Sequence, residues 1–79
     1  MTIGQTIREA REARGVTVTR LAELVGVAAS TVSRVENDLQ VPRQRLLALI
    51  CAHLEMGRRQ ARSLEAMAMR LAPTGAKRD

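Results

Sequence analysis

The sequence predicts an all-α domain of five short helices. Apolar residues recur at helical spacing along the chain, and nowhere do apolar and polar residues alternate over the length of a strand. Glycine and proline residues divide this pattern into five segments. The 79 residues suffice for one domain. Because a chain this short buries only about 60% of its unfolded surface, we expect marginal stability unless a partner adds to it.

The first two helices are expected to begin after threonines, whose side-chain oxygens can accept a backbone N–H of the first turn. Thr2 precedes the first helix, and Thr17 precedes the second, which spans residues 18–25. Gly15 and Gly26 follow these helices, as glycines commonly do at helix C-termini. The expected inward residues are Ile3, Ile7 and Ala10 in the first helix, and Leu21, Leu24 and Val25 in the second.

The third helix is expected over about residues 28–37, because Asn37 and Asp38 tolerate a left-handed helix terminus. Pro42 is expected to open the fourth helix, and Gly57 to end it. The expected inward residues are Val32 and Val35 in the third helix, and Leu46, Leu47, Ile50, Cys51 and Leu54 in the fourth.

The fifth helix is expected over residues 58–72, ending before Pro73. It carries two apolar edges, so we expect one face to pack on the domain and the other on a second subunit, in a two-fold homodimer. The stripe assigned to the dimer is Leu64, Met67, Ala68 and Leu71, and the second edge is Ala66 and Met69.

Arginine dominates the charge of the chain. There are 13 Lys and Arg residues against 8 Asp and Glu residues, which gives a net charge of +5, and 12 of the 13 are Arg. A fixed positive surface attracts polyanions. The absence of Phe, Trp and Tyr removes the aromatic platforms that hold single strands, so the composition favours double-stranded DNA as the partner.

Other classes of function are disfavoured by what the sequence lacks. One Cys and one His fall short of the about four ligands of a zinc site, so no metal is expected. We find no nucleophile–base pair, paired carboxylates or glycine-rich phosphate loop, and therefore expect neither an enzyme nor a cofactor. No apolar run approaches the ~20 residues of a membrane helix, and no signal-peptide core is present, so we expect a cytoplasmic protein with no membrane partner.

Residues 18–37 form the most informative segment, a helix, a tight turn and a second helix. Ala22 is small where the two helices are expected to cross, and Gly26 permits a sharp turn with a positive φ. Val32 and Val35 anchor the second helix from its inner side. Such a helix fits the width of a DNA major groove, although the alternative is a solvated face beside a protein partner. The outward stripe consists of Ala29, Ser30, Ser33 and Arg34.

Over residues 3–54, the chain resembles the Cro and lambda-repressor type of helix-turn-helix family. The resemblance rests on many short pieces in register: Ile3-Gly4, Ile7 to Arg11, Gly15-Val16-Thr17, Leu21 to Val27, Ser30 to Asn37, Pro42, Leu47, Ile50 and Leu54. It implies a five-helix, lambda-repressor-like DNA-binding domain with the helix-turn-helix at its second and third helices. We expect residues 1–57 to form this DNA-binding core, residues 58–72 to pack on it and dimerise, and residues 73–79 to be a disordered tail.

The resemblance also implies roles for individual residues, since in this family the third helix enters the major groove. The residues expected to contact base edges are Ala29, Ser30, Ser33 and Arg34. The residues expected to contact phosphates are Thr17, Thr19, Asn37 and Arg43. A structural salt bridge is expected between Arg11 and Glu36.

The sequence departs from the family pattern at several positions. Val18 stands where Gln is usual, Ala28 replaces a Ser cap, Ala29 replaces Gln or Arg, Arg20 replaces an acidic residue, and Asp38 replaces Gly. Arg34 is then the only side chain of the stripe that can hold guanine in a fork, a contact worth about 1–3 kcal/mol of discrimination. We therefore expect modest direct readout, supplemented by phosphate contacts and DNA shape.

Two functions from different classes follow. The first is a dimeric transcriptional repressor that binds an inverted-repeat operator, with its recognition helices about 34 Å apart. The alternative is an antitoxin or another protein-interaction module that binds a partner, such as a toxin or a phage or plasmid factor, and regulates its own operon.

Overall fold

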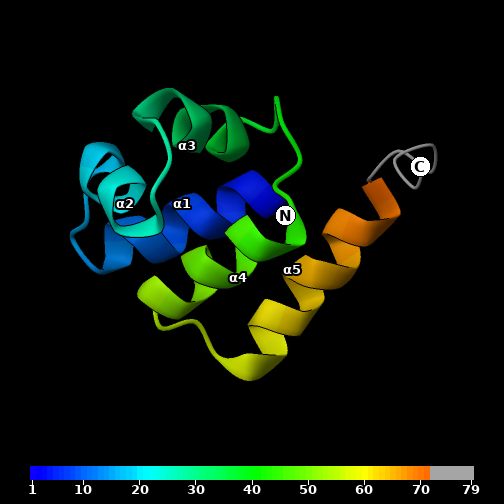
Figure 1. The fold of residues 1–79 in the computed structure, drawn as a ribbon. Helices are drawn as coiled ribbons and strands as arrows, with labels where there is room; N and C mark the ends of the chain where they lie inside the picture. Colours follow the sequence, from blue (N-terminus) through cyan, green and yellow to red (C-terminus); the bar gives the residue numbers. More distant parts are fainter. Residues whose placement is uncertain (72–79) are drawn as a thin grey trace.

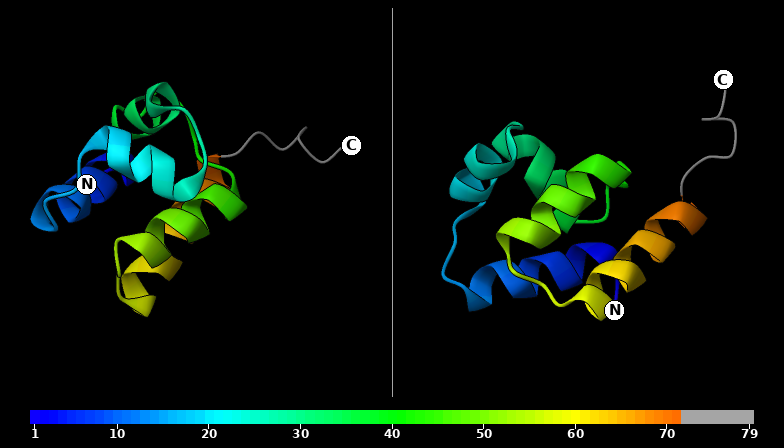
Figure 2. Two further views of the ribbon diagram at one scale, coloured as in Figure 1. Left: turned by 60° about the vertical axis from the view of Figure 1, so that its left-hand side comes forward. Right: turned by 60° about the horizontal axis from the view of Figure 1, so that its bottom comes forward.

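The computed structural model describes residues 1–71, and it confirms the predicted all-α fold (Figure 1). Its five helices are α1 (Ile3–Ala13), α2 (Val18–Val25), α3 (Ala29–Glu36), α4 (Gln44–His53) and α5 (Arg58–Leu71). α5 packs against α4 and α1, at the opposite end of the molecule from α2 and α3 (Figures 1 and 2). Ala72 and the predicted tail at 73–79 lie outside the described residues.

Threonine side chains cap α1 and α2, as predicted. Thr2 Oγ1 accepts a hydrogen bond from the Gln5 backbone N–H at 3.1 Å, while the Gln5 side chain accepts one from the Thr2 N–H at 2.9 Å. Thr17 Oγ1 accepts from the Arg20 N–H at 3.0 Å. Because each cap satisfies an N–H that has no partner within the helix, the two helix starts are fixed locally.

The start of α4 corrects one prediction. The helix begins at Gln44 rather than at Pro42, and the intervening Arg43 has extended backbone, with φ −67° and ψ 156°. The φ of proline suits extended backbone as well as a helix, and Pro42 is buried, so it anchors the loop instead of opening the helix. α3 is likewise one residue shorter at each end than predicted.

Left-handed residues follow four of the helices. They are Gly15 after α1 (φ 69°), Gly26 after α2 (φ 77°), Asp38 after α3 (φ 60°) and Glu55 after α4 (φ 52°). After α4, the N–H groups of Glu55 and Met56 donate to carbonyl oxygens of the last turn at 3.2 and 3.0 Å. The chain therefore leaves the helix at Glu55, and the predicted stop at Gly57 is wrong.

All five helices contribute to one apolar core. Its fully buried large side chains are Ile7, Leu21, Val32, Val35, Leu47, Ile50 and Leu64. Cys51 is buried among them, and burial raises the pKa of its thiol. Leu71, which the sequence placed in the apolar stripe of the fifth helix, is 61% exposed. α5 thus belongs to the core through the middle of the helix rather than through its last turn.

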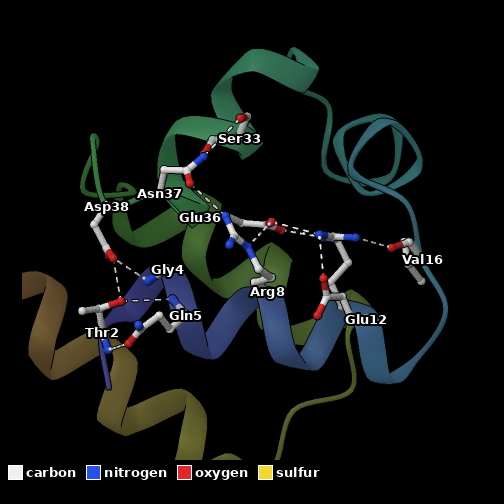
Figure 3. Close-up of polar contacts among 11 residues, drawn as sticks. Thr2, Gly4, Gln5, Arg8, Glu12, Val16, Ser33, Glu36, Asn37 and Asp38 are labelled. Carbon is white, nitrogen blue, oxygen red and sulfur yellow. Dashed lines mark hydrogen bonds and ion pairs between the residues drawn. The ribbon is translucent and has the colours of Figure 1, made fainter.

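A buried carboxylate ties α1 to the end of α3 (Figure 3). Glu36 is 3% exposed, and its two oxygens accept hydrogen bonds from Arg11 at 2.6 and 3.0 Å. Arg11 also donates to the Val16 carbonyl at 2.7 Å, and Arg8 Nε lies 3.5 Å from Glu36 Oε1. The hydrogen bond to Glu36 raises the pKa of Arg11, so its guanidinium stays charged. The side chain of Arg11 therefore connects α1 to the end of α3 and to the loop before α2.

The first turn of α1 lies directly against the same end of α3. A Cβ on Gly4 would overlap the backbone carbonyl oxygens of Val35 and Glu36. The Gly4 N–H donates to Asp38 Oδ1 at 3.0 Å, and Thr2 Oγ1 donates to Asp38 Oδ2 at 2.6 Å. The carboxylate of Asp38 thus offsets the positive end of α1, which explains an aspartate at a left-handed position where the family usually has glycine.

Replacing Glu36 by alanine is expected to lower the free energy of unfolding by about 3 kcal/mol, because it leaves Arg11 without its partner in a largely buried place. Urea denaturation checks this. The control is Arg14→Ala, which removes only the exposed ion pair with Glu55 and should cost less than about 1 kcal/mol. Equal losses in the two variants would contradict the role given to Glu36.

Replacing Gly4 by alanine is expected to destabilise the domain by about 1–3 kcal/mol, because the added methyl meets backbone atoms that cannot rotate away. The matched control is Gly57→Ala, where a Cβ would meet open space and φ is not positive. Thermal unfolding of the two variants distinguishes them. A Gly4→Ala protein as stable as the wild type would show that the helices are not this close.

Candidate nucleic-acid interface

The turn between α2 and α3 is set by one glycine. Gly26 has φ 77°, the positive value that the sequence predicted, and its N–H donates to the Ala22 carbonyl at 2.9 Å. The Val27 N–H donates to the same oxygen at 3.0 Å. Ala22 is buried at the base of this turn. Since only residues 26–28 separate the two helices, the direction of α3 is fixed by the end of α2.

The two faces of α3 differ sharply. Val32, Val35 and Glu36 are each exposed by 3% or less, and they hold the inner face. The structure places all four predicted base-contact residues together on the outer face, where all are exposed: Ala29, Ser30, Ser33 and Arg34. Ala28 precedes the helix without a side-chain cap, as the departure from the family pattern implies. α3 lies at the surface with this face open (Figure 2).

Three of the predicted phosphate-contact residues are exposed and carry polar groups that can donate to a ligand. Thr17 and Thr19 are exposed at the start of α2. Thr17 Oγ1 accepts the Arg20 N–H, which leaves its hydroxyl hydrogen to donate elsewhere. Arg43 is exposed before α4, and it lines an open groove of about 420 Å³ together with Arg45 and with Thr31 of α3. The start of α4 therefore faces the first turn of α3 across this groove.

Asn37, the fourth predicted phosphate contact, has its amide group engaged within the protein. Its Oδ1 accepts from Arg8 NH2 at 2.9 Å, and its Nδ2 donates to the Ser33 carbonyl at 2.8 Å (Figure 3). The Ser33 hydroxyl lies 3.4 Å from the same nitrogen. This contact between Asn37 and Arg8 was not predicted from the sequence. The available signal was that Arg8 stands three residues before Arg11 on α1, because this spacing places both side chains on one face of the helix.

Arginines without a partner carboxylate lie on this surface and on α5. Within residues 1–71, the arginines that lie within 4 Å of a carboxylate are Arg8, Arg11, Arg14 and Arg20. No described carboxylate approaches Arg34, Arg43 or Arg45 as closely, and the same holds for the arginines of α5, which are Arg58, Arg59, Arg62 and Arg70. Arg45 is a further basic residue of this surface that the sequence analysis did not select.

The residues expected at a dimer interface do not share one face. Leu64 and Ala68 are each 1% exposed and are covered by the chain's own core, because α5 packs on α4 and α1. Met67 is half-buried, whereas Leu71 is 61% and Met69 68% exposed. Ala66 is exposed as well, so the open apolar edge of α5 is the predicted one, Ala66 and Met69, whereas Leu71 lies two residues from Met69 and points to another side of the helix.

The described residues contain neither a membrane-spanning helix nor a cluster of metal ligands. Among residues 1–71, no helix is long and apolar enough to cross a membrane. In the same part of the chain, no three His, Cys, Asp or Glu side chains gather where they could hold a metal ion.

Comparisons with known proteins agree with this geometry. The profile of a family described as "Helix-turn-helix domain" matches residues 2–64. Among solved structures, the N-terminal DNA-binding domain of SinR from Bacillus subtilis is similar, with 34% sequence identity and a TM-score of 0.69 over 80% of this chain and 88% of that chain. No curated protein sequence matches the chain. The chain belongs to the helix-turn-helix family of the Cro and lambda-repressor type.

Proposed function

We propose that this protein is a transcriptional regulator that binds double-stranded DNA by inserting α3 into the major groove. The observation that carries the proposal is the exposed stripe of α3, whose opposite face is locked into the core. A helix held in this way presents its outer side chains at a fixed depth. The similarity to the N-terminal DNA-binding domain of SinR supports the same proposal.

Base contacts are assigned to the four outward residues of α3. Arg34 has no described carboxylate within 4 Å, so its guanidinium can donate two hydrogen bonds to O6 and N7 of a guanine. Ser30 and Ser33 can contact several bases, and the methyl group of Ala29 can meet a thymine methyl.

Phosphate contacts are assigned to Thr17, Thr19 and Arg43, and we add Arg45. The two threonines stand at the N-terminus of α2, where backbone N–H groups and the helix dipole favour a phosphate. Asn37 belongs to the same surface, but its amide is directed at Ser33, so we assign it no phosphate.

We further propose that the protein acts as a homodimeric repressor on an inverted repeat, so that a bound dimer blocks access to a promoter. The exposed edge of α5, Ala66 and Met69, supports an apolar contact between subunits, because Met69 is 68% exposed beside a second exposed apolar side chain. The same edge would serve an antitoxin bound to its toxin, and the oligomeric state separates the two candidates.

Replacing Arg34 by alanine is expected to reduce the preference for the specific duplex over random DNA by roughly 10- to 100-fold, because the fork on guanine is lost. Replacing Arg43 should weaken all duplexes alike and lower the slope of log affinity against log salt by about 1. Gel shifts at several salt concentrations, on the gene's upstream region and on random DNA, test both. Arg59→Ala on α5 is the control. A wild-type protein that binds all duplexes with equal affinity would contradict specific binding.

Replacing Met69 by glutamate is expected to convert a dimer to a monomer, because it places a charge in the apolar edge of α5. Sedimentation equilibrium measures the mass of each variant. Leu39→Glu is the control, since Leu39 is 78% exposed but lies in the loop after α3. A wild-type protein that stays monomeric at its highest soluble concentrations would contradict the homodimer.

A further inference from the structure

We propose that Asn37 is a positioning residue that directs the hydroxyl hydrogen of Ser33 toward the DNA, and that it thereby decides which bases Ser33 accepts. The inference rests on the proposed function, because it concerns the base that Ser33 meets in the major groove. It deepens that function by naming a residue that sets specificity without touching a base.

The orientation of the Asn37 amide is fixed by Arg8. Arg8 NH2 lies 2.9 Å from one end of the amide, and a guanidinium carries only hydrogen-bond donors. The end of the amide beside Arg8 must therefore be the oxygen. The amide nitrogen consequently faces Ser33, 2.8 Å from its carbonyl oxygen and 3.4 Å from its hydroxyl oxygen (Figure 3).

Arg8, whose side chain is 42% exposed, is in turn paired with a buried carboxylate. Its Nε lies 3.5 Å from Oε1 of Glu36, whose side chain is only 2% exposed. Glu36 is itself held by two hydrogen bonds from Arg11. A continuous chain of polar contacts thus runs from the core through Arg8 and Asn37 to the exposed hydroxyl of Ser33.

These polar contacts determine which hydrogen-bonding group Ser33 can offer to a base. A serine hydroxyl has one hydrogen and two lone pairs. The Asn37 N–H takes one lone pair, and the hydroxyl hydrogen cannot point at another donor, so it must point away from Asn37. Among the described residues, no acceptor takes that hydrogen. Ser33 therefore presents a donor on the exposed face of α3.

A fixed donor discriminates among bases. In the major groove, guanine offers N7 and O6, adenine offers N7, and thymine offers O4 as acceptors. Cytosine offers only its amino group, which is a donor, so it would leave the Ser33 hydrogen without a base acceptor. At the position that Ser33 contacts, we expect guanine and thymine to be favoured over cytosine by about tenfold, with adenine, which offers both an acceptor and a donor, between them.

The Asn37→Asp substitution reverses this logic without changing the shape of the side chain. A carboxylate still accepts from Arg8, but its second oxygen cannot donate to the Ser33 carbonyl and is repelled by it. That oxygen therefore turns toward the Ser33 hydroxyl and accepts its hydrogen. Ser33 is then left with lone pairs only, and it should favour the amino groups of adenine or cytosine. Asn37→Ala frees the hydroxyl to rotate, so it should flatten the preference rather than reverse it.

The test is selection of bound duplexes from a randomised library by the wild type, the two Asn37 variants and Ser33→Ala. We expect Ser33→Ala to erase the preference at one position of each half-site. Asn37→Asp should shift that position from guanine or thymine toward adenine or cytosine, by about tenfold in the ratio, and leave the other positions unchanged. Circular dichroism confirms that each variant is folded.

Adding Ser33→Ala to Asn37→Asp provides the decisive control. If Asn37 acts through Ser33, the double variant should show the base preferences of Ser33→Ala alone. A wild-type motif that Asn37→Asp leaves unaltered at the Ser33 position would overturn the inference and leave the proposed function intact. So would a Ser33→Ala protein that keeps every base preference. A wild type that selects no motif would overturn both.

Discussion

The arrangement of this domain depends on one buried carboxylate. Glu36 is charged, almost inaccessible to solvent, and satisfied by two hydrogen bonds from Arg11 and an ion pair with Arg8. An ion placed in a core of this kind is favourable only while its partners are held in position. The geometry of α3 relative to α1 is therefore specified by charge as well as by apolar packing, and it cannot drift without exposing or orphaning the carboxylate.

The same end of α3 carries the close contacts that turn a bundle of helices into a defined surface. Gly4 allows the backbone of α1 to reach the last carbonyl groups of α3, and Asp38 returns from the end of α3 to cap α1. Each contact alone is small. Together with Glu36, they hold the C-terminal half of α3 from three directions, while Gly26 fixes its other end through α2. The outer face of the helix is thus rigid although it is fully open to solvent.

The features that could be predicted from the sequence are those that short stretches of the chain determine. The threonine caps, the positive φ at Gly26 and the outward stripe of α3 follow from periodicity and turn chemistry within a few residues. The start of α4 could not be predicted, because proline fits a helix and a loop equally well and only the burial of Pro42 decides. The close backbone contact at Gly4 and the hydrogen bond between Arg8 and Asn37 each join parts of the chain about 30 residues apart, and local patterns carry no information on such contacts.

The burial of Leu64 and Ala68 has a thermodynamic consequence. Since both side chains complete the core that α1 and α4 share, α5 and the DNA-facing half of the molecule form one folding unit. A ligand that binds only the native state raises the folded fraction by mass action, wherever on the molecule it binds. Any partner that covers the outer edge of α5 therefore raises the folded fraction, and with it the fraction of molecules that present α3 correctly. Where that partner is a second copy, as in the proposed dimer, protein concentration would set this fraction.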